Sequence, residues 1–209
     1  MCSMPVDILP IVMCGDRALR HPAERVDLSE LGTPAMARLI SEMRATMEAA
    51  PGVGLAAPQV GVPLQLAVIQ DGPERWGQAS ATDLAARQRT ALPFTVLVNP
   101  SLIALRSEGT AAFYEGCLSI PGLTAVVNRY RSVRVEALDE QGEPFSRQYN
   151  GWPARIVQHE IDHLGGTLYL DRAIARSLST TENYLANWAG RDVQEVSRAL
   201  AFELPATSA

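Results

Sequence analysis

The sequence predicts an α+β fold in which antiparallel β-sheets pack around a central helix, with further helices near the N-terminus and the C-terminus. A helical spacing of apolar residues follows Thr33, a second helical stretch follows Asn150, and short strand-like segments lie between them. Helices that flank a run of strands joined by tight turns are typical of α+β domains. A chain of 209 residues has the length of one domain, so we expect residues 1–209 to form a single domain.

The first helix is predicted from Thr33 to a stop at Pro51-Gly52. Thr33 is a good N-cap residue, and proline suits the first helical position that follows it. We interpret the methionines of this helix as core residues, because they recur on one apolar face. The apolar positions of this face are Met36, Leu39, Ile40, Met43 and Met47.

Short strands are predicted from runs of strand-forming residues, the last two joined by a hairpin turn at Gln141-Gly142. They are Leu64–Ile69, Phe94–Asn99, Ser101–Leu105, Ser132–Leu138 and Pro144–Tyr149. Between the first two strands, residues 71–92 show little hydrophobic periodicity. We expect this segment to be a solvated surface insertion rather than a lid over a site, because it carries no obvious chemistry.

Two further helices are expected after the strands. One runs from Trp152 to Leu164, with Asn150 as its cap and Gly165-Gly166 as its stop. The other covers about residues 181–203, although Gly190 interrupts its pattern.

Composition and charge exclude several classes of protein. Hydrophobic residues make up 47% of the chain and charged residues 20%, and no apolar run reaches the roughly 20 residues of a membrane helix. The net charge of −5 includes no basic block, so we expect neither direct nucleic-acid binding nor a membrane partner. The N-terminus lacks the charge order of a secretory signal, and the sparse cysteines, Cys2, Cys14 and Cys117, fit a reducing compartment. We therefore expect a cytoplasmic protein.

The strongest chemical pattern is the segment QHEIDH, which carries two of the three histidines of the chain. His159 and His163 stand at i and i+4 of a predicted helix, so both imidazoles can reach one ion. With Glu160 beside them they form an H-E-x-x-H pattern, in which the glutamate moves the protons of a metal-bound water. The alternative is that both histidines are hydrogen-bonded core residues, with Glu160 and Asp162 on a solvated face.

A catalytic metal site on this helix needs a third protein ligand and one open position. No histidine follows His163, so the downstream candidates are carboxylates. Upstream, the thiolate of Cys117 is a good ligand, although a lone cysteine is more often simply buried. Spacing alone leaves open Cys117, Asp171, Glu182 and Glu195.

Three segments resemble, in order and approximate spacing, the motifs of one enzyme family, the peptide deformylases. The segments are GVGLAAPQ at Gly52–Gln59, EGCLS at Glu115–Ser119 and QHEIDH at Gln158–His163. Peptide deformylases remove the formyl group from N-formylmethionine at the start of new polypeptides. The resemblance implies the same hydrolysis here, with N-formylmethionyl nascent peptides as partners and formate as a product.

The resemblance also assigns roles within the predicted central metal-binding helix and around it. It implies that Cys117, His159 and His163 hold the metal, and that a water takes the fourth position. It implies that Glu160 is the general acid and base.

Further roles concern the oxyanion and the substrate. The resemblance implies that the side-chain amide of Gln59 and the backbone N–H of Leu118 stabilise the oxyanion of the tetrahedral intermediate. It implies that the peptide backbone pairs along the first motif, near Gly54, and that an apolar pocket accepts the methionine side chain. The residues of this pocket are Val53, Phe113, Trp152 and Ile156.

Metal identity does not follow from one thiolate and two imidazoles, because this ligand set suits Zn²⁺, Fe²⁺ and Ni²⁺. The resemblance implies one Fe²⁺ per chain, with Zn, Ni or Co as replacements in purified protein. By analogy alone, the C-terminal helix is expected to contact the ribosome transiently. One departure concerns Gly122-Leu123-Thr124, which stands where many bacterial members carry an arginine that contacts the substrate.

Two other functions compete with deformylation. A peptidase of the zincin type would cut inside peptides and take its third ligand downstream of His163. A non-catalytic metal-binding or peptide-binding module would keep its metal but have no turnover to lose when Glu160 is replaced.

Overall fold

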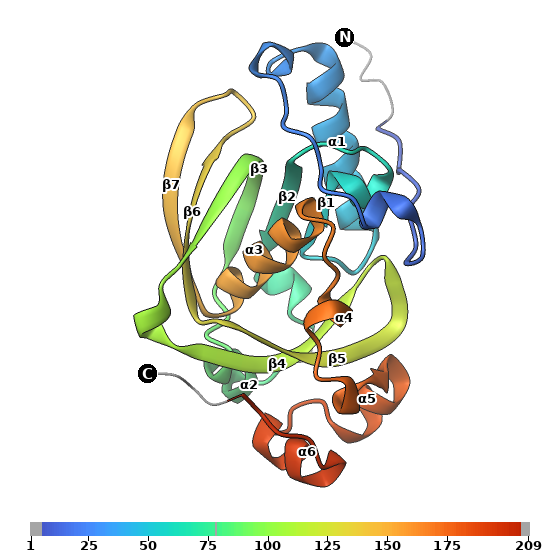
Figure 1. Cartoon of the computed structure of the whole chain (residues 1–209), viewed down its shortest axis with the longest axis vertical. Coiled ribbons are helices and arrows are strands. Elements are labelled where there is room, and N and C mark those ends of the chain that lie inside the picture. The colour runs from blue at the N-terminus through green and yellow to red at the C-terminus, as the bar shows by residue number, and fades with distance from the viewer. Residues whose placement is uncertain (1–5, 78, 206–209) are drawn as a thin grey trace.

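The computed structural model describes residues 6–77 and 79–205, in which two antiparallel β-sheets surround helix α3 (Figure 1). Two residues named or included above lie outside the described residues: Cys2, one of the sparse cysteines, and Gln78, which belongs to the segment 71–92. The larger sheet has the order β1 (Gly54–Ala56), β2 (Leu66–Asp71), β3 (Leu92–Ala104), β6 (Ser132–Leu138) and β7 (Pro144–Asn150). The smaller sheet has the order β4 (Thr110–Cys117), β5 (Ile120–Tyr130) and β8 (Ser179–Thr180). The predicted α+β class is confirmed.

Helix α1 (Pro34–Ala49) begins where the sequence predicts. The Thr33 hydroxyl accepts a hydrogen bond from the backbone N–H of Met36 at 3.3 Å, which satisfies one of the free donors of the first turn. The predicted apolar face is buried against the larger sheet. Its buried members are Met36, Ile40, Met43 and Met47.

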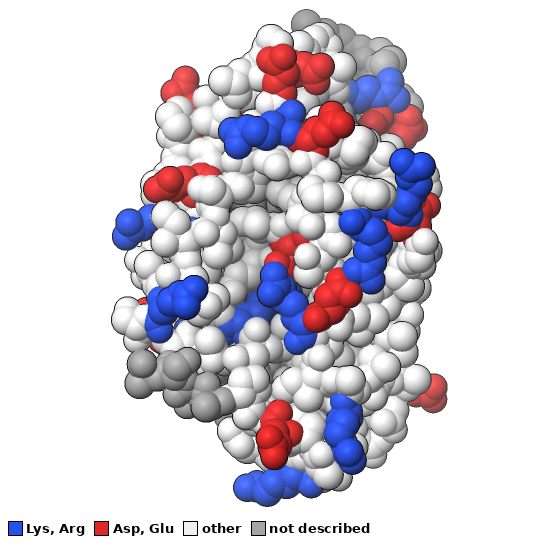
Figure 2. Space-filling view, viewed as in Figure 1, with Lys and Arg blue, Asp and Glu red and all other residues white. Residues whose placement is uncertain are grey.

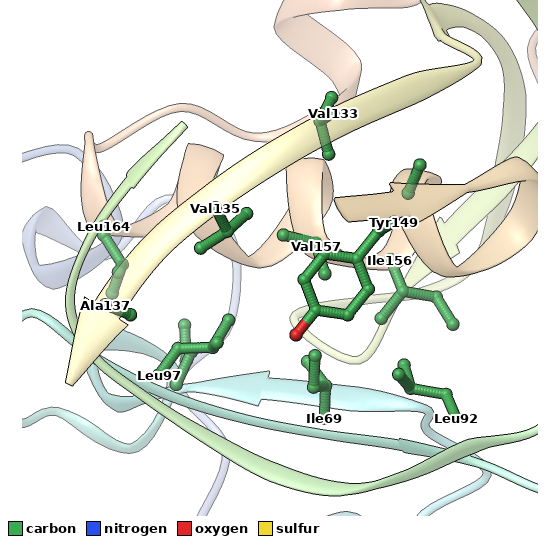
Figure 3. Close-up of a cluster of buried hydrophobic side chains, with 13 residues drawn as sticks. Ile69, Leu92, Leu97, Val133, Val135, Ala137, Tyr149, Ile156, Val157 and Leu164 are labelled. Carbon is green, nitrogen blue, oxygen red and sulfur yellow. The ribbon is translucent and has the colours of Figure 1, made fainter. Parts of the chain in front are cut away.

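Helix α3 (Gly151–Leu164) packs one face on the larger sheet, as Figure 3 shows. Ile156, Val157 and Leu164 contribute to a core that the sheet completes with Ile69 and Leu97, among others. Full burial of a side chain of this size stabilises the fold by about 1.5–3 kcal/mol. Because this face packs on the sheet, the rotation of α3 about its axis is fixed. The direction in which its other side chains point is fixed with it.

Asn150 is the N-cap residue of α3, but its side chain makes no capping hydrogen bond. Its amide oxygen instead accepts a hydrogen bond from Gln148 at 3.0 Å. The predicted start of α3 is therefore confirmed, but among the described residues the Asn150 side chain does not make the expected capping hydrogen bond.

The two predicted strands at residues 94–99 and 101–105 are one strand, β3. Asn99 has a φ of 49°, and the register with β6 shifts between Val98 and Ser101. The side chain of Asn99 bonds to both backbone groups of Val26, at 2.8 and 3.0 Å, which stabilises this irregular residue. The irregularity bends the strand without ending it, so the predicted break was wrong.

Strands β4 and β5 have no counterpart among the predicted strands. They form a hairpin whose turn contains Leu118 and Ser119. Pro121 and Gly122 lie inside β5, and these residue types ordinarily indicate a turn. Both lie where the register with β4 shifts, between the pairs Glu115–Ala125 and Cys117–Ile120, so these turn-forming residues concealed the start of β5.

The expected single helix over residues 181–203 is two helices, α5 (Thr181–Asn187) and α6 (Val193–Leu200). Gly190 lies between them with a φ of 76°, a conformation that ends a helix. Asp192 then caps α6, because its carboxylate accepts the backbone N–H of Gln194 at 2.6 Å. The prediction of one helix is wrong at Gly190.

The segment 71–92 leaves the sheet at the end of β2, contains helix α2 (Ala81–Ala86) and returns in β3. The carboxylate of Asp71 is fully buried and accepts two hydrogen bonds from Arg89, at 2.7 and 2.8 Å. Leu92 is also buried in the core. The expectation of a solvated insertion is therefore wrong at both ends of the segment.

Charged side chains of both signs are scattered over the face shown in Figure 2. No helix within residues 6–77 and 79–205 combines the length and apolar character needed to cross a membrane.

Candidate metal centre

Cys117, His159 and His163 come together between α3 and the end of β4. Their ligand atoms lie within 4.8 Å of one another, and Nε2 of His163 is 3.3 Å from the sulfur of Cys117. The two imidazoles are 5.0 Å apart between ring centroids, with an angle of 73° between their planes. This geometry follows from the i, i+4 spacing, and one thiolate with two imidazoles is a suitable ligand set for Zn²⁺ or Fe²⁺.

The downstream carboxylates lie elsewhere in the described chain. Asp171 pairs with Arg20 at 2.5 Å, and Glu195 pairs with Arg191 at 2.5 Å. Glu182 is exposed in the first turn of α5. The geometry therefore favours Cys117 among the candidates that spacing left open.

A buried carboxylate orients the first histidine. Nδ1 of His159 donates a hydrogen bond to Glu115 at 3.0 Å, which directs Nε2 toward the other two ligands. Burial raises the pKa of Glu115, but the charge of Arg129, the bond from His159 and the charge of Arg155 together hold this pKa well below its usual range. Glu115 is therefore ionised at neutral pH, and it is the hydrogen-bond partner of a candidate metal ligand.

Glu115, Arg129, Arg155 and Asp162 form one connected set, which we call the Glu115 network. Arg129 bonds to Glu115 at 2.6 and 2.9 Å and to Asp162 at 2.8 Å, while Arg155 reaches Glu115 at 2.5 Å. Burial lowers the pKa of Arg155 to about 10 despite the charge of Glu115. The network joins α3 to β4 and β5, so it fixes the helix on its second side.

Sequence reasoning missed this network and left Asp162 on a solvated face in its alternative interpretation. The signal that indicates it is an arginine in an apolar strand, Val126-Val127-Asn128-Arg129, because a buried arginine needs a carboxylate partner.

Glu160 is buried beside the three ligands, with 4% of its surface exposed. Burial raises the pKa of its carboxyl to about 7, and the charge of His159 only partly opposes this. Its Oε2 atom has no hydrogen-bond partner among the described residues, and neither has the buried Nδ1 of His163. A carboxyl with a pKa near neutrality is suited to accept and return a proton.

Gly54 makes room for this carboxylate. A Cβ atom at Gly54 would lie 2.2 Å from Oε1 of Glu160 and 2.6 Å from its Cδ. Only glycine allows the β1 backbone to approach Glu160 this closely.

The amide of Gln59 is held rigidly at the other side of the site. Its oxygen accepts the backbone N–H of Ala56 at 2.9 Å, and its nitrogen donates to Ser119 at 3.2 Å. The same nitrogen is 3.5 Å from the sulfur of Cys117. Leu118 lies in the adjacent turn between β4 and β5. The structure therefore brings together the residues that the sequence assigned to the metal, the proton and the oxyanion.

The residues predicted to receive the substrate lie beside this centre. Val53, Trp152 and Ile156 belong to one apolar cluster, and the Phe113 ring meets Trp152 edge-on at 6.2 Å. Gly54 opens β1, which is an edge strand of the larger sheet and is thus able to pair with an added strand.

The region that departs from the family pattern lies within strand β5 of the smaller sheet. Leu123 and Thr124 pair with β8, and the Thr124 hydroxyl donates to the backbone oxygen of Glu115 at 2.7 Å. Thr124 is buried, so this position holds an internal contact rather than an exposed cation.

Comparisons with known proteins agree with this geometry. A model of the polypeptide deformylase family matches residues 8–178. Peptide deformylase 3 of Streptomyces avermitilis is 52% identical over 200 residues, which cover 94% of this chain and 85% of that protein. Peptide deformylase 1A, chloroplastic/mitochondrial, of Arabidopsis thaliana is 43% identical over 178 residues, 85% of this chain and 66% of that protein.

Solved structures give the same result. The Met-Ala-Ser bound crystal structure of class I type b peptide deformylase from Acinetobacter baumannii has a TM-score of 0.71 to this chain at 34% sequence identity. The similarity covers 80% of this chain and 99% of that one. With a family match over most of its length and a relative of more than half identity, the chain belongs to the polypeptide deformylase family of hydrolases.

Proposed function

We propose that the protein hydrolyses the formyl group from the N-terminal N-formylmethionine of newly synthesised polypeptides and releases formate. The observation that carries the proposal is the meeting of Cys117, His159 and His163 within 4.8 Å, with Glu160 and Gln59 beside them. A peptidase of the zincin type is disfavoured, because no downstream carboxylate joins this group in the described chain.

Cys117, His159 and His163 would hold a divalent metal ion. Such an ion supplies the nucleophile at neutral pH, because it lowers the pKa of a coordinated water to about 7. The donor set fits the ion, since the Nδ1 bond of His159 to Glu115 leaves its Nε2 free as a ligand.

Glu160 would move the proton that the reaction requires. It accepts a proton from the attacking water and gives it to the amide nitrogen, so that the new N-terminal amine can leave. Its pKa of about 7 suits both steps near neutral pH.

Gln59 and Leu118 would stabilise the negative charge that develops on the formyl oxygen. The Gln59 amide is held by Ala56 and Ser119 before the substrate arrives, so it need not reorganise during the reaction. One donor of this kind typically contributes about 2.7–4 kcal/mol to the transition state.

The peptide would pair with the edge of β1 near Gly54 and insert its methionine among the apolar residues. Backbone pairing of this kind reads few side chains, so many sequences after methionine would be accepted. The pocket comprises Val53, Phe113, Trp152 and Ile156. A transient ribosome contact through the C-terminal helices and a cytoplasmic location complete the proposal by analogy.

The test compares N-formyl-Met-Ala-Ser with its N-acetyl analogue at equal concentration. We expect formate from the first peptide, little release of acetate from the second, and no cut between residues of either. Cleavage of an internal peptide bond without release of formate would contradict the proposal and favour a peptidase.

Iron is proposed as the ion on the family resemblance. Protein purified without oxygen should contain about one iron per chain and lose activity in air, as the metal or Cys117 is oxidised. A zinc form that is equally active and indifferent to oxygen would contradict iron as the working metal.

A further inference from the structure

The segment between β2 and β3 contacts the chain just before β1. Arg75 donates a hydrogen bond to the backbone oxygen of Gly52 at 2.6 Å, just before Val53. The base of the segment is fixed by the buried carboxylate of Asp71, which accepts hydrogen bonds from Arg89 and from the Trp76 indole at 3.1 Å. A buried pair of this kind holds the segment in one position relative to the sheet.

The same segment lies against the first residue of α3. Gly151 has a φ of 59°, and a Cβ atom there would lie 2.5 Å from Cβ of Gln88 and 2.6 Å from its backbone oxygen. No side chain fits between the two backbones, so the segment and the start of the metal-binding helix are in direct contact.

Arg87 then covers the two aromatic residues assigned to the methionine pocket. Its guanidinium lies 4.7 Å from the centre of the Trp152 ring and 5.6 Å from that of Phe113. It also donates to the Tyr184 hydroxyl at 3.4 Å, which anchors its far end on α5. A cation over two aromatic rings is attracted to both of them.

Arg155 faces the same rings, at 5.2 Å from Phe113 and 5.8 Å from Trp152. The space left among these groups is a cavity of about 10 Å³, roughly the room for one water molecule. Little space therefore remains between the two rings and the two arginines. Residues lining this cavity include Ala86, Arg87, Gln88, Phe113, Trp152 and Arg155.

We propose that Arg87 is a specificity-determining residue, which holds Phe113 and Trp152 in place and limits the pocket to a side chain of methionine's length. The inference rests on the proposed function. It adds Arg87, from the segment between β2 and β3, to the residues that bound the methionine pocket. A purely structural Arg87 would affect stability alone, whereas a pocket wall changes the choice between substrates.

The experiment measures kcat and KM for N-formyl-Met-Ala-Ser and N-formyl-Phe-Ala-Ser with the metal-loaded wild type and Arg87→Ala. We expect the ratio of kcat/KM for the Phe peptide to that for the Met peptide to rise about tenfold in the variant. The change should lie mainly in KM, and Arg87→Lys should restore part of the wild-type ratio. Arg147→Ala is the matched control, because Arg147 lies 5.6 Å from the Phe145 ring on the other edge strand, β7.

A folded Arg87→Ala protein with the wild-type ratio would overturn the inference, as would an equal change in Arg147→Ala. If Arg87→Ala does not fold, Arg87→Met replaces it, since this variant keeps the length and loses the charge; an unchanged ratio there overturns the inference too. Absence of formate from both peptides with the wild type would instead refute the proposed function, and the inference would fall with it.

Discussion

Nδ1 of His159 donates a hydrogen bond to Glu115 across 3.0 Å, which links a candidate metal ligand to a buried set of ion pairs. Both residues stand in segments that the sequence singled out, yet their contact depends on the hairpin of β4 and β5. The second motif thus contributes a ligand, Cys117, and also the group that orients another ligand.

Replacement of Glu115 by Gln should weaken both the metal site and the fold. Loss of the carboxylate leaves Arg129 and Arg155 without their buried partner, which should cost about 3–5 kcal/mol in urea unfolding. Metal affinity should fall by about 10–100-fold in a competition titration, because His159 loses its orienting partner. The control is Glu48→Gln, whose exposed pair with Arg44 should contribute less than about 1 kcal/mol. Equal effects in the two variants would contradict this role of Glu115.

Replacement of Gly54 by Ala should displace the Glu160 carboxylate, since the added Cβ would lie 2.2 Å from its oxygen. We expect formate release to fall by about 10²-fold or more, while the free energy of unfolding falls by about 1–3 kcal/mol. In Gly165→Ala the nearest atom to the new Cβ is 3.4 Å away, so this variant should keep its activity. An active Gly54→Ala enzyme would show that the close approach is not needed.

Replacement of Gln59 by Leu removes the proposed oxyanion donor. We expect kcat to fall by about 10²–10³-fold, with unchanged metal content by elemental analysis. Gln65→Leu removes an amide whose one hydrogen bond among the described residues is to the Ala23 backbone oxygen, and kcat should be unaffected there. A fall confined to KM in Gln59→Leu would point to substrate binding rather than to the transition state.

Asp171 should stabilise the fold in a pH-dependent way without holding the metal. Burial raises the pKa of its carboxyl, but the bonds from Arg20 and from the Leu168 N–H outweigh this and lower it. A lowered pKa means that the stabilisation is present above about pH 4 and is lost as the pH falls below it. Asp171→Asn should therefore lose about 0.5–1 kcal/mol of stability at pH 7, less at pH 3.5, and retain its metal. Loss of the metal would restore Asp171 as a ligand candidate.

Local rules predicted the parts of the fold that depend on neighbouring residues. The start of α1 follows from Thr33 and its proline, and the meeting of His159 and His163 follows from helical spacing. Strand β5 escaped prediction because Pro121 and Gly122 stand near its start, at the register shift with β4, where an irregular ladder tolerates such residues.

The rest of the site depends on contacts between distant segments. Glu115, Arg129 and Arg155 meet only when α3 packs against the hairpin, and no spacing in the sequence indicates this. The contact of Gln88 with Gly151 likewise depends on tertiary packing. For this reason the sequence pattern of residues 71–92 indicates a solvated segment. For Cys117, spacing leaves the choice open, and the agreement of the three motifs favours it independently of the geometry.

The most direct test of the account is the rate of formate release from N-formyl-Met-Ala-Ser by wild type and Glu160→Gln, each loaded to the same metal content. The account predicts formate from the wild type and a rate about 10²–10⁴-fold lower in the variant, because the proton has no carrier. No formate from the metal-loaded wild type, or an undiminished rate in Glu160→Gln, would contradict it.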